Sequence, residues 1–238
     1  GNLMVVGSSG GGKTSFIQTM LYAIVMQHPP QVVNFYIADF SSQNLGVFDL
    51  APHSGGIAYG TDPDRNEKLV ALLLKELNQR KEDFKSKEVG SYKEYAKRYQ
   101  NKPAIVFVID NFAAYTESNP KLEESILLLS RDGSGYGIYL VLTCSNTNEI
   151  RGKIRQNLPF GIGIQLGDQF EYENALNCKV EITAEDRTPG RGLVLSPGPQ
   201  EFQTALCKRV LSQGSIVDAI RLDLTKMGDA YSTDRAVR

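Results

Sequence analysis

The stretch that decides the fold of this chain is Gly7-Ser8-Ser9-Gly10-Gly11-Gly12-Lys13-Thr14. It matches the pattern G-x-x-x-x-G-K-[ST] and lies between an apolar run, residues 3–6, and a segment with apolar residues at helical spacing, residues 15–27. A strand, a glycine-rich loop and a helix in this order are typical of a phosphate-binding loop. The alternative is a glycine-rich turn that binds nothing, but such a turn does not require this strand and this helix. The pattern therefore predicts nucleotide binding, and binding alone does not establish hydrolysis.

Each residue type in the loop has a chemical reason to be there. Glycines allow backbone N–H groups to turn inward onto phosphate oxygens, and Lys13 supplies a positive charge for the terminal phosphates. The hydroxyl group of Thr14 is a candidate Mg²⁺ ligand. We therefore expect ATP with Mg²⁺ as the ligand and residues Gly7 to Ser15 as its binding loop.

A second anchor is Asp110, which ends the uninterrupted apolar run of residues 104–109. Such a run is typical of a central parallel strand that is covered on both faces. In phosphate-loop NTPases a carboxylate at the tip of such a strand helps to hold Mg²⁺. An aspartate at a strand end can also be a helix cap, but the presence of the loop favours the metal role. Thr14 and Asp110 are therefore the expected metal residues.

Strands alternate with helices along the chain, which is typical of a doubly wound α/β domain. The hydrophobic patterns predict strands at residues 3–6, 32–38, 104–109, 138–143 and 161–166, and helices at 15–27, 63–84, 91–99, 122–131 and 216–231. We therefore predict an α/β P-loop NTPase fold of the RecA/ASCE type. Its central sheet is expected to be doubly wound, mostly parallel and flanked by helices.

Composition limits the classes of function. The chain has 238 residues, of which 41% are hydrophobic, and this length suits one large α/β core. Its net charge of −1 argues against a protein that grips the nucleic-acid backbone. Basic and aromatic residues alternate over residues 78–102, which could bind single-stranded nucleic acid or an acidic peptide, but a solvated helix face is favoured. Three cysteines without C-x-x-C spacing suggest neither disulfides nor zinc, as expected in a reducing, cytoplasmic compartment.

Several further motifs resemble, in their order, those of FtsK/SpoIIIE-type ATPases. They are Ile109-Asp110-Asn111-Phe112, Leu129-Ser130-Arg131-Asp132-Gly133, residues 136–143, Ile154-Arg155-Gln156-Asn157-Leu158 and Pro189-Gly190-Arg191-Gly192-Leu193. A narrower resemblance, to the non-first tandem ATPase modules of type VII (ESX/WXG100) secretion coupling proteins, rests on Ala38-Asp39-Phe40, Asp110-Asn111-Phe112 and Ser130-Arg131-Asp132-Gly133. The resemblance runs from the first strand to about Cys207. It implies an ATP- and Mg²⁺-binding module with Arg191 as a further nucleotide contact.

The resemblance also implies weak catalysis, because three positions depart from the pattern of active relatives. Asn111 stands where they place a glutamate that deprotonates the attacking water, and general-base assistance is worth about 10² to 10⁴-fold. Cys144 stands where translocases of the family place a glutamine that senses the terminal phosphate. Phe170 stands near the position of an arginine that reaches a neighbouring nucleotide, a contribution of about 10³ to 10⁵-fold. We therefore assign no catalytic residue and expect weak or no hydrolysis.

Other groups leave alternatives open. Candidate substitute bases are Glu117, Asp132 and Glu149, and candidate arginines for a neighbouring site are Arg131, Arg151, Arg155 and Arg191. With such substitutes the chain would be an active DNA or protein translocase motor of the FtsK/SpoIIIE type. A third alternative is an adaptor with a vestigial pocket that recognises a C-terminal signal. Cys144 as a nucleophile is less favoured than Cys144 as a small buried residue, because no histidine is placed beside it.

The expected organisation is an ATPase domain at residues 1–210 and a C-terminal helix and linker at residues 211–238, as a domain of a longer chain. No apolar run approaches the roughly 18 residues of a membrane-spanning helix. The resemblance implies a cytoplasmic domain of a membrane-anchored bacterial protein, which meets the membrane only through other parts of the full-length chain. Implied partners are sister ATPase modules, secreted WXG100-type proteins and further copies of the chain, and not nucleic acid. The implied role is assembly, regulation or substrate recognition during protein export.

Overall fold

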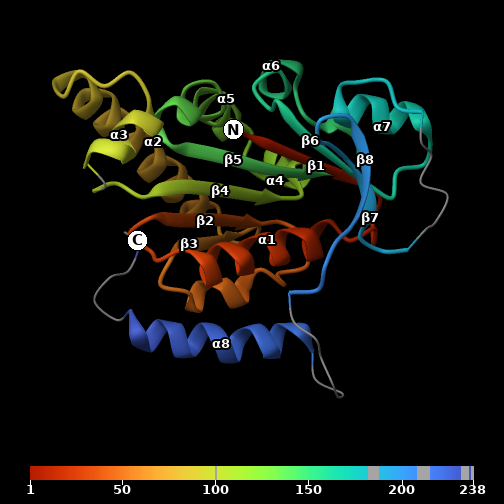
Figure 1. The fold of residues 1–238 in the computed structure, drawn as a ribbon, viewed down its shortest axis with the longest axis horizontal. Helices are drawn as coiled ribbons and strands as arrows, with labels where there is room; N and C mark the ends of the chain where they lie inside the picture. The colour runs from red at the N-terminus through yellow and green to blue at the C-terminus, as the bar shows by residue number, and fades with distance from the viewer. Residues whose placement is uncertain (100, 182–187, 208–214, 232–235, 237–238) are drawn as a thin grey trace.

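One eight-stranded sheet organises the computed structural model, which describes residues 1–99, 101–181, 188–207, 215–231 and 236 (Figure 1). The strands are β1 (Leu3–Gly7), β2 (Val33–Asp39), β3 (Ser54–Tyr59), β4 (Ala104–Asp110), β5 (Ile138–Cys144), β6 (Phe160–Ile164), β7 (Arg191–Leu195) and β8 (Pro199–Gln203). Their order across the sheet is β3-β2-β4-β5-β1-β6-β7-β8. From β3 to β6 in this order neighbouring strands are parallel, and β7 and β8 extend the sheet in antiparallel pairs. The predicted doubly wound, mostly parallel sheet is confirmed.

Helices cover both faces of this sheet (Figure 1). They are α1 (Lys13–Gln27), α2 (Pro63–Ser86), α3 (Tyr92–Tyr99), α4 (Phe112–Ser118), α5 (Glu123–Asp132), α6 (Gly152–Arg155), α7 (Gln169–Leu176) and α8 (Ile216–Ala230). Short 3₁₀ segments are η1 (Gly46–Leu50), η2 (Pro120–Leu122), η3 (Gly133–Tyr136) and η4 (Thr147–Glu149). Successive side chains of a strand point to opposite faces. Accordingly Met4 and Val6 pack with apolar residues of α2, α4 and α5, whereas Val5 packs with those of α1, η1 and α8.

The strand order brings the predicted site to one edge of the sheet. β5 lies between β1 and β4, so the loop after β1 and Asp110 at the end of β4 are separated by one strand. The parallel strands end at the same edge, which we call the carboxyl edge, and begin at the opposite, amino edge. Ligands of open α/β sheets bind outside the carboxyl ends of the strands. The phosphate loop, Asp110 and Asp39 at the end of β2 share this edge.

The strand β3 was not predicted. Its sequence, Ser54-Gly55-Gly56-Ile57-Ala58-Tyr59, contains two glycines, and glycine is depleted in strands. The strand forms because β2 supplies a parallel partner for it. The ring of Tyr36 covers Gly55, where an added Cβ would lie 2.2 Å from ring atoms. Glycine is therefore needed here for close approach, which a hydrophobic pattern does not reveal.

The predicted C-terminal helix is confirmed as α8. Its buried residues Ile220 and Leu224 pack in the same core cluster as Phe48 of η1. Tyr22 of α1 also donates a hydrogen bond of 2.7 Å to Asp223 of α8. The predicted boundary between residues 210 and 211, and most of the predicted linker after α8, lie outside the described residues. Among the described helices, none has the length and hydropathy that a membrane crossing requires.

Candidate nucleotide-binding site

The predicted phosphate loop joins β1 to α1 at the carboxyl edge. Gly10 and Gly12 have φ angles of 74° and 108°, which residues with a Cβ rarely adopt. Gly7 has no room for a side chain, because an added Cβ would lie 2.5 Å from the carbonyl oxygen of Ile164. Among the described residues, no side chain caps the start of α1 and no acidic residue lies in its first turn. The positive end of the helix therefore remains available to an anion, as the loop motif predicts.

The ammonium group of Lys13 folds back over the loop. It donates hydrogen bonds to the carbonyl oxygens of Gly7 at 2.6 Å and Ser8 at 3.0 Å. Partial burial lowers the pKa of Lys13, and the negative charge of Asp110 opposes this shift. These hydrogen bonds hold the ammonium group of Lys13 beside the loop, where the motif predicts that phosphates bind.

Asp110 is held by two hydroxyl groups from opposite sides. Thr14 of α1 donates to Oδ2 at 3.0 Å, and Thr143 of β5 donates to Oδ1 at 2.5 Å. The structure therefore brings together the predicted metal residues Thr14 and Asp110. Thr143 was not predicted as a site residue, and the signal for it is slight: one polar residue near the end of an otherwise apolar strand.

Burial dominates the electrostatics of Asp110. The residue is 1% exposed, and burial raises the pKa of its carboxyl group, while the hydrogen bonds from Thr143 and Thr14 act in the opposite direction. Asp39 lies beside Asp110 in the register of β2 and β4, and its charge adds to the rise in pKa. The carboxylate of Asp39 binds the loop after β2, where it accepts hydrogen bonds from the backbone N–H groups of Ser41, Gln43 and Leu45. Asp110 is therefore the carboxylate that faces the phosphate loop.

The oxygen atoms at this point fit Mg²⁺. Thr14 Oγ1 and Asp110 Oδ2 lie 3.0 Å apart, and Mg²⁺ prefers hard oxygen ligands. Within the described part of the chain, no group of three or more His, Cys, Asp or Glu residues could hold a metal by itself. Mg²⁺ is usually bound through one or two protein ligands together with substrate phosphates and water. Two protein oxygens beside a phosphate loop therefore fit a metal that arrives with its nucleotide.

Asn111, which follows Asp110, has a structural task. It begins α4 with a φ angle of 69°, a left-handed conformation that asparagine tolerates better than most residues. Its side-chain oxygen accepts a hydrogen bond from the N–H of Ala114 at 3.4 Å, and its amide group donates to the carbonyl oxygen of Phe40 at 3.2 Å. The side chain therefore caps α4 and ties it to the loop after β2. These contacts support the prediction that this position supplies no general base.

The two other altered positions differ in exposure. Cys144 is 1% exposed, and burial raises the pKa of its thiol to about 12, so the thiol stays protonated at neutral pH. This supports a small buried residue at position 144 and not a nucleophile. Phe170 of α7 is 70% exposed and borders a pocket of about 170 Å³ together with Val6 and Asn146. The aromatic ring therefore lies on the surface near the end of β1.

The candidate substitute bases lie in different places. Hydrogen bonds from Arg131 and Lys81 lower the pKa of Asp132 to about 2. Asp132 ends α5 before β5 begins, so it lies at the amino edge, on the opposite side of the sheet from the loop. The prediction of Asp132 as a substitute base is therefore wrong. Glu117 lies exposed in the last turn of α4. Glu149 follows β5 at the carboxyl edge, and its negative charge acts on the pKa of Lys13, so it is the candidate that lies near the loop.

The turn before β7 packs directly on the phosphate loop. The N–H of Gly190 donates to the carbonyl oxygen of Gly11 at 2.7 Å, and an added Cβ on Gly12 would lie 2.7 Å from the Gly190 nitrogen. The guanidinium of Arg191 pairs with the carboxylate of Glu201 on β8 at 2.9 Å. The turn is therefore part of the loop's surroundings, and a contact between the Arg191 side chain and nucleotide remains a prediction.

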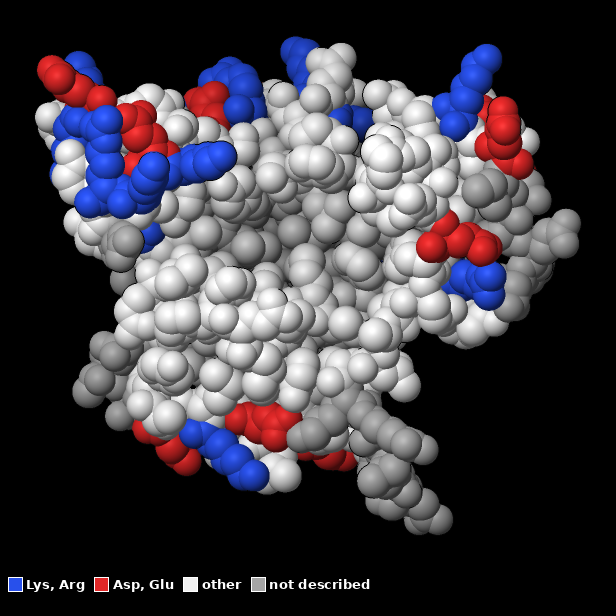
Figure 2. All heavy atoms as spheres, viewed as in Figure 1, with Lys and Arg blue, Asp and Glu red and all other residues white. Residues whose placement is uncertain are grey.

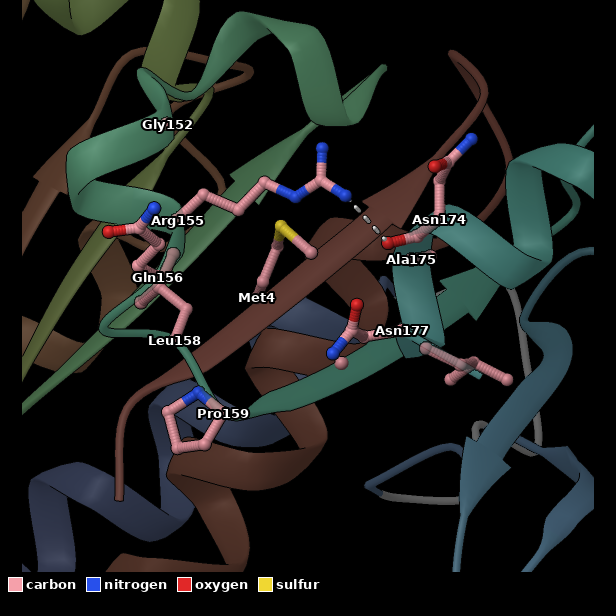
Figure 3. Close-up of a pocket in the computed structure, with 11 residues that line it drawn as sticks. Met4, Gly152, Arg155, Gln156, Leu158, Pro159, Asn174, Ala175 and Asn177 are labelled. Atoms are coloured by element: carbon pink, nitrogen blue, oxygen red, sulfur yellow. Dashed lines mark hydrogen bonds between the residues drawn. The ribbon is translucent and has the colours of Figure 1, made fainter. Parts of the chain in front are cut away.

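Two candidate arginines are engaged away from the loop. Arg151 pairs with Glu124 at 3.0 Å. Arg155 of α6 extends across a pocket of about 610 Å³ toward α7, where it donates to the carbonyl oxygen of Asn174 at 3.4 Å (Figure 3). Met4 of β1 also lines this pocket, upstream of the phosphate loop on the same strand. Arg155 thus bridges α6 and α7, and a role at a neighbouring site is untested.

The described residues of the basic and aromatic segment at residues 78–102 lie mostly on α2 and α3, where positively and negatively charged side chains occur side by side (Figure 2). Tyr95 is buried and stacks on Phe84 with ring centres 4.5 Å apart. Lys87 pairs with Asp83 at 3.1 Å. The aromatic residues thus pack α3 onto the domain, and both signs of charge occur together, as expected of a solvated face.

The fold and the site together define a class. A mostly parallel sheet, a G-x-x-x-x-G-K-T loop between β1 and α1, and a β4 carboxylate that faces the loop threonine are the marks of a P-loop NTPase domain. The family model described as FtsK/SpoIIIE family matches residues 1–174. The chain belongs to the FtsK/SpoIIIE family.

Individual relatives come from type VII secretion systems. The chain is 30% identical over 245 aligned residues to the ESX-1 secretion system protein EccCb1 of Mycolicibacterium smegmatis, covering 99% of this chain and 41% of that protein. It superimposes with a TM-score of 0.87 and 29% identity on Thermomonospora curvata EccC (ATPases 2 and 3) in complex with a signal sequence peptide, covering 100% of this chain and 44% of that one. For EssC (ATPases 2 and 3) of Geobacillus thermodenitrificans the TM-score is 0.85 at 26% identity, with 98% and 44% covered. The chain is therefore homologous to EccC and EssC and spans less than half the length of these relatives.

Proposed function

We propose that this chain is a Mg·ATP-binding module of a type VII secretion ATPase that hydrolyses ATP slowly or not at all. The observation that carries the proposal is the hydrogen bond between Thr14 and Asp110 at the mouth of the loop that Lys13 closes. This is the arrangement of oxygen ligands and positive charge that Mg·ATP requires.

The role of each group follows from its chemistry. Backbone N–H groups of residues Gly7 to Ser15, with the start of α1, would hold the phosphates. The ammonium group of Lys13 would move from its carbonyl partners to the terminal phosphates. Thr14 and Asp110 would hold Mg²⁺, which neutralises phosphate charge when it is bound. Arg191 would approach the nucleotide from the turn that packs on the loop.

Weak hydrolysis is proposed because the side chain after Asp110 has other tasks. Asn111 caps α4 and bonds Phe40, and an amide group cannot accept a proton from water. Nucleotide would then act as a structural ligand that stabilises the conformation or assembly to which it binds more tightly.

The proposed setting is a larger secretion ATPase. Its relatives are more than twice the length of this chain, and an EccC relative was solved with a signal sequence peptide. We therefore include sister ATPase modules, further copies of the chain and exported WXG100-type proteins as its partners. The ATPase domain would comprise residues 1–210, on the cytoplasmic side of a membrane-anchored protein, and would serve assembly, regulation or substrate recognition.

A working translocase motor is the second candidate, because Glu149 lies at the carboxyl edge near Lys13. In that case Glu149 would replace the missing base. Turnover that is strong, stimulated by DNA or by an exported protein, and lost in Glu149→Gln would favour the motor over the binding module.

Calorimetric titration of the purified chain with Mg·ATP tests the binding proposal. We expect saturable binding by the wild type and its loss in Lys13→Ala. The matched control is Lys97→Ala, which removes an exposed lysine from α3 and is expected to bind like the wild type. A wild type that does not bind Mg·ATP, or a Lys13→Ala variant that binds equally well, would contradict the proposal.

A further inference from the structure

Thr143 is a buried hydroxyl group between the phosphate-loop strand and the strand that ends in Asp110. It is 0% exposed on β5, which pairs with β1 on one side and β4 on the other. Its Oγ1 donates to Asp110 Oδ1 at 2.5 Å and accepts from the backbone N–H of Asn111 at 2.8 Å. One side chain thus contacts both the candidate metal residue and the residue that begins α4.

We infer that Thr143 is a positioning residue: it holds Asp110 so that the second carboxylate oxygen faces Thr14, and these two residues would hold Mg²⁺. The inference rests on the proposed function, because it concerns the metal that would arrive with the nucleotide. Residues that orient a metal ligand through a hydrogen bond typically change metal affinity when they are removed.

The direction of the hydrogen bonds supports this assignment. A hydroxyl group has one proton to donate and two lone pairs to accept with. A backbone N–H can only donate, so Thr143 must accept from Asn111. Its single proton is then directed to Asp110 Oδ1, and the carboxylate cannot rotate without losing this bond.

The two hydroxyl groups at Asp110 are not equivalent. Thr14 lies in the first turn of α1, beside the loop, and its hydroxyl oxygen is itself a candidate metal ligand, so it would give up its hydrogen bond to Asp110 when it binds the metal. Thr143 lies on a central strand with no exposed surface, so it would keep its contact when metal binds. Thr143 is therefore the group that fixes the orientation of Asp110 in both states.

The test measures ATP affinity with Mg²⁺ and again with excess EDTA, since the ratio of the two affinities reports the metal alone. Thr143→Val removes the hydroxyl group at nearly constant volume. We expect this variant to lose about 10 to 100-fold of the Mg²⁺-dependent gain in affinity, while its affinity in EDTA stays that of the wild type. Thr143→Ser keeps both hydrogen bonds and should keep the full ratio. The matched control is Thr116→Val, whose hydroxyl group bonds only carbonyl oxygens within α4 among the described residues.

Each outcome decides the inference. The inference is overturned if Thr143→Val keeps the wild-type ratio of ATP affinities with Mg²⁺ and with EDTA. If the variant loses the same affinity for ATP under both conditions, the role of Thr143 is purely structural and the inference is overturned as well. If Thr143→Val does not fold, Thr143→Ser remains decisive, because a folded serine variant without the Mg²⁺-dependent gain contradicts the inference. A wild type that binds no nucleotide overturns the proposed function as well. If the wild type binds ATP more tightly with Mg²⁺ than with EDTA, and Thr143→Val shows the same ratio of affinities, only the inference is overturned.

Discussion

The two edges of the sheet treat buried charge in opposite ways. At the amino edge Arg80 is 1% exposed and fully engaged, with Glu76 at 2.7 Å and the carbonyl oxygens of Tyr136 at 2.9 Å and Pro103 at 2.8 Å. At the carboxyl edge Asp110 is equally buried but receives two neutral hydroxyl groups, and no cation is paired with it among the described residues.

The ammonium group of Lys13, near Asp110, also lacks a charged hydrogen-bond partner among the described residues. Lys13 bonds the carbonyl oxygens of its own loop and, within the described residues, no carboxylate. Buried charges are normally paired, because removal from water is costly. Asp110 and Lys13 thus lie at one edge, and neither forms a salt bridge with another side chain in the described part of the chain. This indicates a site that a ligand carrying both a metal and phosphates would complete, whereas Arg80 at the amino edge already has its partners.

The largest effect is expected from breaking the amino edge. Arg80→Ala leaves the carbonyl oxygens of Tyr136 and Pro103 without their donor and, among the described residues, leaves Glu76 only its longer ion pair with Lys102, at 3.8 Å. This should lower the free energy of unfolding by about 3 to 5 kcal/mol. Urea unfolding measures this change. The control Arg98→Ala breaks an exposed pair with Glu94 and should cost about 0 to 1 kcal/mol. Equal losses in the two variants would contradict the contrast between a complete edge and a solvated surface.

Asp110→Asn removes the buried charge of the carboxyl edge, and its expected effect on stability has the opposite sign to that of Arg80→Ala. Burial raises the pKa of Asp110 above its value in the unfolded chain, so its ionised form weakens the fold at neutral pH. We expect the neutral amide to raise the free energy of unfolding at pH 7 and to remove the Mg²⁺-dependent part of ATP affinity. Unfolding curves and calorimetry measure the two effects. A variant that is less stable than the wild type at pH 7 would show that the carboxylate is a structural group.

Asn111→Glu sharpens the comparison, because it tests whether the altered catalytic position has become structural. Glutamate must adopt a φ angle near 69° and loses the amide bond to Phe40, so we expect a loss of about 1 to 2 kcal/mol in the free energy of unfolding. We also expect no gain in ATP turnover, since Cys144 and Phe170 are unchanged. A stable variant with increased turnover would mean that only the base was missing.

The smallest effect concerns a buried histidine. His53 is 0% exposed, its Nε2 bonds the carbonyl oxygen of His28 at 2.7 Å, and its Nδ1 has no partner among the described residues. Burial lowers the pKa of His53, so its stabilising contribution is complete above the unfolded pKa of about 6.5 and is lost as pH falls below it. We expect the free energy of unfolding to decline as the pH falls below about 6.5, with a slope of at most about 1.4 kcal/mol per pH unit. This decline should be smaller in His53→Gln, and identical slopes would contradict the assignment.

Much of the fold could be predicted from the sequence, because its signals are local. The uninterrupted run of β4 and the periodic helix α2 are visible without any tertiary knowledge. β3 could not be predicted, since it depends on β2 and on the ring that covers Gly55. The antiparallel end formed by β7 and β8 likewise depends on pairing between segments that show only weak patterns of their own.

The site divides in the same way. The loop from Gly7 to Thr14 is contiguous, and Asp110 is marked by the strand that it ends, so both could be predicted. The hydrogen bonds of Thr143 and the pairing of Arg191 with Glu201 join separate strands, and no spacing in the sequence announces them. The sequence predicted that Asn111 supplies no general base, but it did not reveal the left-handed backbone that explains an asparagine at this position.

The most direct test of the central claim is the rate of phosphate release by the purified chain at saturating Mg·ATP. Enzymes turn over at a median of about 10 s⁻¹, and loss of a general base slows them by about 10² to 10⁴-fold. We therefore predict that the site binds Mg·ATP saturably and that phosphate is released more slowly than about 0.1 s⁻¹. Release at about 10 s⁻¹ that disappears in Lys13→Ala would contradict the account and would make this module a working ATPase.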